Sequence, residues 1–107
     1  VLPRALRLTR PDDFRRVMRA GKKHSGELMV IYTVPSSDSF RWGFVVSKNV
    51  GHAPRRNRVK RQQRAIAADL SRVGTPAREV VVRALPAAAT AEGDALRAEL
   101  QRLWEGA

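Results

Sequence analysis

One segment, Arg55-Arg56-Asn57-Arg58-Val59-Lys60-Arg61-Gln62-Gln63-Arg64, contains the residue types that bind phosphate groups. Six of these ten residues are cationic and none is acidic. The acid-free stretch around it, residues 41–68, contains eight Lys and Arg. It therefore carries +8 of the net charge of +11, which leaves 13 cations against 10 acids elsewhere. Cations that neutralise phosphates release counterions, and this release favours binding strongly. The charge distribution therefore predicts a nucleic-acid surface in this stretch.

The same segment has the spacing of a helix. Pro54 suits the first helical turn, and we predict a helix from about residue 54 to 72. One apolar face of this helix follows steps of seven, four and three residues, and it consists of Val59, Ile66, Leu70 and Val73. Cations four residues apart, such as Arg56, Lys60 and Arg64, destabilise an isolated helix by roughly 0.2–0.5 kcal/mol per pair. A polyanionic partner offsets this cost. The alternative, a solvated surface helix, ordinarily mixes the two signs of charge.

The elements that must position this helix can be read from the remaining pattern. Residues 1–10 predict an irregular basic arm. A helix is predicted from Pro11, with Asp12 and Asp13 in its first turn and Gly21 as its C-terminal cap. We interpret Lys22-Lys23 as a basic turn.

Three strands follow from short apolar runs rich in β-branched residues, and they are predicted over residues 27–34, 40–47 and 79–84. Residues 35–39 predict a hairpin that joins the first two, and Gly43 predicts a bulge or a close backbone approach. Thr90 is the predicted N-cap of a final amphipathic helix. The order α-β-β-α-β-α predicts an α+β fold, a small α/β sandwich that forms a single domain over residues 1–107.

The chain lacks the residues of a self-contained catalyst. It has no cysteine, and neither His24 nor His52 has partners at metal-ligand spacing. We therefore predict no catalytic residue and no metal ligand in the chain itself. With no long apolar run, the composition predicts a reducing, cytoplasmic location and no membrane partner. An autonomous nuclease is disfavoured for want of an acid/base set, and a helix-turn-helix DNA binder for want of a compact helical triplet.

Three successive motifs lead from the second predicted strand into the basic helix. They are Gly43-Phe44-Val45-Val46-Ser47-Lys48, Asn49-Val50-Gly51-His52-Ala53 and Arg56-Asn57-Arg58-Val59-Lys60-Arg61. Together they resemble a known family, the bacterial ribonuclease P protein subunit. In that family a strand ends in Ser-Lys, a Gly-x-Ala turn follows, and a helix opens with Arg-Asn-Arg. Asp13-Phe14, Val30-Ile31-Tyr32 and the final Leu/Trp helix also fit, so the resemblance covers nearly the whole chain.

The resemblance implies that a catalytic RNA, with Mg²⁺ held in the RNA-containing holoenzyme, removes the 5′ leader of precursor tRNA. It implies that the protein binds no metal alone, and that its partners are ribonuclease P RNA and precursor tRNA rather than DNA. It also implies an unusual left-handed β-α-β crossover around the basic helix. A ribosomal or other structural RNA-binding protein of similar fold is the alternative, and association with a cleavage-competent RNA distinguishes the two.

The resemblance also implies site residues, at the positions of this sequence that match the family's motifs. The residues predicted to bind RNA are Lys48, Arg55, Arg56, Asn57, Arg58, Lys60, Arg61 and Arg64. Phe14 and Tyr32 match aromatic residues of the family's leader-binding cleft, and Met18 occupies a cleft position that is often Phe. Gln62 and Gln63 stand where the family commonly has apolar residues, so they interrupt the apolar face of the basic helix.

Overall fold

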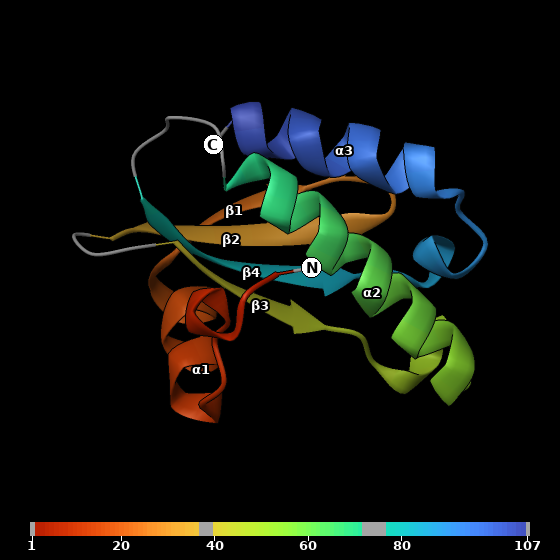
Figure 1. Cartoon of the computed structure of the whole chain (residues 1–107), viewed down its shortest axis with the longest axis horizontal. Helices are drawn as coiled ribbons and strands as arrows, with labels where there is room; N and C mark the ends of the chain where they lie inside the picture. The colour runs from red at the N-terminus through yellow and green to blue at the C-terminus, as the bar shows by residue number, and fades with distance from the viewer. Residues whose placement is uncertain (1, 37–39, 72–76, 107) are drawn as a thin grey trace.

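The computed structural model describes residues 2–36, 40–71 and 77–106 (Figure 1). Its helices and strands, in chain order, are α1 (Pro11–Ala20), β1 (Lys22–Ser25), β2 (Met29–Pro35), β3 (Arg41–Val45), α2 (Ala53–Leu70), β4 (Arg78–Ala84) and α3 (Gly93–Glu105). Three short 3-10 helices accompany them, η1 (Arg4–Leu6), η2 (Lys48–Val50) and η3 (Pro86–Ala89).

The four strands form one mixed sheet in the order β1-β2-β4-β3. The β1/β2 and β2/β4 pairs are antiparallel, whereas β3 and β4 are parallel. Helices α2 and α3 cover one face and α1 covers the other (Figure 1). Side chains alternate between these faces along each strand. In β2, for example, Met29 and Ile31 point towards α2 and α3, and Val30 and Tyr32 towards α1.

Two tryptophans form the centre of the larger core, between the sheet and the two covering helices. The rings of Trp42 in β3 and Trp104 in α3 stack with their centroids 5.1 Å apart. The Trp42 indole Nε1 donates to Ser71 Oγ at 2.8 Å, and that hydroxyl donates to the Ala67 carbonyl at the same distance. This chain of contacts ties the end of α2 to the edge strand β3.

The α+β class and the basic helix are confirmed, but the predicted hairpin between the first two apolar runs, residues 27–34 and 40–47, is wrong. Strand β4 lies between β2 and β3. Its residues Val80, Val81 and Val82 are fully buried, so this strand needs a neighbour on each side and a helix on each face. A local hairpin would have left it at an edge.

Two smaller predictions are also corrected. Lys22-Lys23 is the start of strand β1 rather than a turn, so the order of elements is α-β-β-β-α-β-α. This edge strand is polar and rich in lysine, a composition that protects sheet edges from mispairing and that hides them from an apolar pattern. Glu92, not Thr90, precedes the first turn of α3, and Thr90 ends η3 instead. Residues 37–39 and 72–76, including the predicted end of α2, lie outside the described residues.

Candidate RNA-binding surfaces

A glycine turn sets the start of the basic helix. Gly51 has φ of 150°, a backbone conformation that other residues rarely adopt. A Cβ there would also lie 3.0 Å from Cδ of Arg55. Pro54 occupies the first turn of α2, where its missing N–H leaves no hydrogen bond unmade. The Gly-x-Ala turn therefore redirects the chain from η2 into the helix that carries the cations.

Seven of the eight residues predicted from the sequence to bind RNA lie on the outer face of α2 or along one flank of it, and Lys48 lies in η2, just before this helix. Those exposed to solvent are Lys48, Arg55, Asn57, Arg58 and Arg61. Along the flank, Arg56, Lys60 and Arg64 stand four residues apart and are half-buried. The Nε atoms of Arg56 and Arg64 are covered and make no hydrogen bond within the described chain, because the aliphatic stems lie against the protein.

Nothing in the described residues neutralises this charge. None of the seven cations predicted to bind RNA forms an ion pair there, and only Arg55 donates a side-chain hydrogen bond to a described residue, the Ala89 carbonyl at 3.1 Å. Several arginines of the other helices differ. Arg16 binds Glu79, and Arg97 binds Asp69 at 2.9 Å. The basic surface of α2 is therefore available to an external polyanion.

The two glutamines of α2 lie in different environments. Gln62 is half-buried, whereas Gln63 is fully buried in the position that the apolar stripe requires between Val59 and Ile66. Both amide atoms of Gln63 lack a hydrogen-bond partner within the described chain. Helix α2 therefore packs closely against the core at Gln63, although the amide of this residue is unpaired within the described chain.

The predicted leader-cleft residues come together on the opposite face of the sheet. Tyr32 belongs to the buried cluster between the sheet and α1, and Phe14 and Met18 pack at its edge. Tyr32 is only 8 % exposed, whereas Phe14 and Met18 are half-buried. The three residues therefore share one site, in which Tyr32 forms the floor and the α1 residues form the rim.

Gly43 is required by this arrangement. A Cβ at Gly43 would lie 2.5 Å from Cε2 of Phe14 and 3.2 Å from Cδ1 of Leu8. The predicted close approach at this glycine is therefore confirmed. The group that approaches is the Phe14 ring, which lies against the backbone of β3.

Two cations beside this site were missed in the sequence. Lys23 in β1 lies directly opposite Tyr32, and Arg83 in β4 lies between Val30 and Val45. Both are exposed and project from the same face as Tyr32. Their positions depend on strand β1 and on the pairing of β4. The sequence offers one signal: Val81 and Arg83 are two residues apart in β4 and therefore share a face of the strand. This signal identifies Arg83 as a neighbour of Tyr32 only when β4 is known to pair with β2 in the centre of the sheet.

An ion pair holds α1 over this face. The Arg16 guanidinium donates to the two Glu79 oxygens at 3.0 and 2.8 Å, and to Asp13 at 3.3 Å. The Glu79 hydrogen bond, and then that of Asp13, raise the pKa of Arg16 above its ordinary value. Helix α1 is thus fixed to β4, and Phe14 and Met18 are fixed with it.

Within residues 2–36, 40–71 and 77–106, no three His, Cys, Asp or Glu side chains gather in a way that could hold a metal ion. No helix in this part of the chain is long and apolar enough to cross a membrane.

Comparisons with known proteins agree with this geometry. The family model described as Ribonuclease P matches residues 2–107. The ribonuclease P protein component of Acidothermus cellulolyticus is 44% identical, over 96% of this chain and 88% of that protein. The Micrococcus luteus component is 42% identical, over 92% and 85%.

Solved structures of similar proteins share the fold. The Staphylococcus aureus RNase P protein superposes with a TM-score of 0.86 at 27% identity, covering 95% of this chain and 94% of that one. The Thermotoga maritima protein gives 0.80 at 26% identity, covering 91% and 93%. The chain therefore belongs to the bacterial ribonuclease P protein family, whose members are the protein subunit of an RNA-based endoribonuclease.

Proposed function

We propose that this chain binds ribonuclease P RNA through α2 and the 5′ leader of precursor tRNA through the α1 face of the sheet. The observation that carries the RNA contact is the set of seven cations on and beside α2 that have no acidic partner in the described residues. Phosphate contacts of this kind position a protein on its RNA without reading sequence.

The leader assignment is supported by the chemistry of the α1 face. Single-strand binders combine aromatic surface with flanking cations. The half-buried ring of Phe14 and the Met18 thioether supply the first feature, and Lys23 and Arg83 supply the second. Tyr32, with 8 % of its surface exposed, offers an edge rather than a free ring face. Its hydroxyl has no partner within the described chain, so it is free to bond a nucleotide.

The chemical step belongs to the RNA partner in this proposal. No three His, Cys, Asp or Glu side chains of the described residues gather to hold a metal ion, and we assign Mg²⁺ to the RNA of the holoenzyme, where it would supply the hydrolytic chemistry. The contribution of the chain is to bind and orient the precursor. This role places the protein in the cytoplasm, with its RNA substrates. We also propose the family's left-handed crossover for β3-α2-β4, which the close superposition on the Staphylococcus aureus protein supports.

Differential binding of precursor and mature tRNA tests the leader site. In the assembled holoenzyme, Phe14→Ala and Tyr32→Ala should weaken precursor binding selectively, because loss of a stacking contact costs roughly 1–3 kcal/mol. Met18→Phe should tighten precursor binding, because it adds aromatic surface at the rim. Dissociation constants for both tRNAs, measured beside the melting temperature of each variant, check this.

The control is mature tRNA, which has no leader. If the alanine variants weaken both tRNAs equally and in proportion to lost stability, these residues serve only as core and the leader binds elsewhere. The burial of Tyr32 makes Phe14→Ala the more decisive variant, since truncating a half-buried rim residue disturbs the core less.

A further inference from the structure

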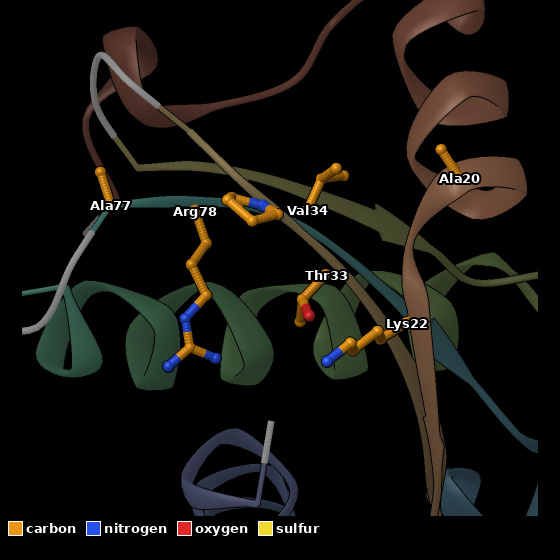
Figure 2. Close-up of a pocket in the computed structure, with 7 residues that line it drawn as sticks. Ala20, Lys22, Thr33, Val34, Ala77 and Arg78 are labelled. Carbon is orange, nitrogen blue, oxygen red and sulfur yellow. The ribbon is translucent and has the colours of Figure 1, made fainter.

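A third cationic site lies apart from α2 and from the α1 rim. It is a cavity of about 380 Å³ at the end of the sheet, where β1 begins, β2 ends and β4 begins. Its polar lining comes from Lys22, Thr33 and Arg78, and its apolar lining comes chiefly from Ala20, Val34 and Pro35 (Figure 2).

Strand register brings the three polar side chains together. Lys22 lies opposite Thr33, and Arg78 lies opposite Pro35. Because side chains two residues apart share a face, Thr33, Lys22 and Arg78 project from the same side of the sheet. Figure 2 shows the side chains of Lys22 and Arg78 extending on the same side of the strands as that of Thr33.

Neither cation is neutralised by a described residue. Within the described chain, Lys22 and Arg78 form no ion pair, and the hydroxyl of Thr33 forms no hydrogen bond although Thr33 is only 7 % exposed. The Arg78 guanidinium lies 4.1 Å from the centroid of the Trp104 ring. Contact with the ring face fixes the guanidinium and leaves its N–H groups at the edge free to donate. Among the described residues, the cavity is thus lined by three donors and no acid.

Size and position indicate the ligand. Ammonium, guanidinium and hydroxyl donors together match the oxygens of a phosphate group. The volume falls in the range of small-ligand sites, and the apolar walls leave room for the nucleoside beside the phosphate. Val34 also packs in the cluster that contains Tyr32, Phe14 and Met18. The three donors project from the α2/α3 face, opposite to Tyr32, so Val34 is what connects the cavity with the α1 face. A leader that follows the α1 face would reach the cavity where it turns around this end of the sheet.

We propose that this cavity binds the phosphate of one nucleotide, held by Lys22, Arg78 and Thr33, and that this nucleotide belongs to the leader where it passes the end of β2. The inference rests on the proposed leader site. A free mononucleotide presents the same chemistry, so the experiment separates the two sources.

The test uses holoenzyme assembled with Lys22→Gln, Arg78→Gln or Arg78→Lys protein. The substrates are a precursor with a long leader and one whose leader is trimmed to a single nucleotide. We expect each glutamine variant to weaken the long-leader precursor about threefold to tenfold, with the trimmed precursor unchanged. Arg78→Lys keeps a cation over Trp104 and should restore most of the binding. Arg19→Gln, which removes an exposed charge from α1, is the matched control and should change neither substrate.

Two outcomes would overturn the inference. If Phe14→Ala weakens the long-leader precursor but Lys22→Gln does not, the leader site stands and the cavity is not part of it. Binding of adenosine 5′-monophosphate to the full chain can be measured by tryptophan fluorescence. If Lys22→Gln abolishes that binding without affecting the binding of either precursor, the cavity binds a free nucleotide rather than the leader. Failure of Phe14→Ala to distinguish the precursors would instead reject the proposed leader site. Lys22 is exposed, so Lys22→Gln folds even if Arg78→Gln does not.

Discussion

Gln63 places a primary amide where the core of α2 is apolar. It is fully buried, and neither amide atom has a partner within the described chain. A buried polar group without a hydrogen bond costs about 1–3 kcal/mol. Gln63→Met conserves length and flexibility while removing this cost, so it should raise the free energy of unfolding by about that amount.

Urea denaturation of the chain, with Gln62→Met as the matched variant, checks this prediction. Gln62 is half-buried, so its amide is already solvated and the same change should have little effect. A Gln63→Met protein no more stable than the parent would indicate that a bound water satisfies the buried amide.

Individual site residues could be assigned from the sequence only where a local motif identified them. The cations of α2 are adjacent in sequence, and their exposure follows from the helical period. Lys23 and Arg83 could not be found this way, because they join Tyr32 only through the pairing of three strands. The burial of Tyr32 was equally out of reach, since it depends on how α1 lies across the sheet.

At the scale of elements, one carboxylate joins α3 to the β1–β2 turn. The oxygens of Glu99 accept hydrogen bonds from the backbone N–H groups of Glu27 and Leu28, each at 2.7 Å. A side chain at Gly26 would collide with this carboxylate, since a Cβ there would lie 2.5 Å from its carbon. The short polar strand β1 is thus held in place from outside the sheet.

Removing this carboxylate should loosen β1. Hydrogen bonds to a charged group contribute about 1.5–3 kcal/mol, so Glu99→Ala should lower the free energy of unfolding by up to that amount. Amide exchange should accelerate first in residues 22–28, because β1 is an edge strand with few other supports. Glu105→Ala, on the exposed side of the same helix, should change stability by less than about 0.5 kcal/mol. Uniform exchange across the sheet would contradict a local role for Glu99.

Elements with a strong local period could be predicted, and those defined by distant partners could not. Helices α1 and α2 and strands β2 and β4 follow from apolar spacing. Strand β1 has no apolar alternation, because its edge position leaves most of it in water. The mistaken hairpin shows the same limit, since sequence proximity favoured a β2–β3 pair. The three buried valines of β4 instead require the central place in the sheet.

At the scale of the whole molecule, the chain should have no nuclease activity alone. The two proposed RNA surfaces bind and position, and the described residues contain no cluster of three potential metal ligands. Purified chain incubated with precursor tRNA and Mg²⁺ should leave the leader intact, and addition of ribonuclease P RNA should start cleavage. Cleavage by chain that has first been treated with a ribonuclease to digest contaminating RNA, and then freed of that ribonuclease before the precursor is added, would refute this.

The two RNA surfaces lie on opposite faces of one sheet, and their energetics should therefore separate. Contacts from α2 to phosphate release counterions. If about four of its cations engage, the slope of log Kobs against log salt concentration should be about −3 to −4 for ribonuclease P RNA. Replacing Lys60 and Arg61 together with Ala should reduce that slope by about one unit per lost contact. Arg97→Ala, on α3 and already paired with Asp69, should leave it unchanged.

The same titrations distinguish the faces. Phe14 contributes no charge, so Phe14→Ala should weaken the precursor at every salt concentration without altering the slope. The α2 variants should alter the slope for ribonuclease P RNA whether or not a leader is present. A salt slope that does not respond to Lys60 and Arg61 would mean that α2 faces solvent in the holoenzyme. The RNA contact would then have to come from another cationic surface, of which the exposed Lys23 and Arg83 are the nearest candidates on the α1 face.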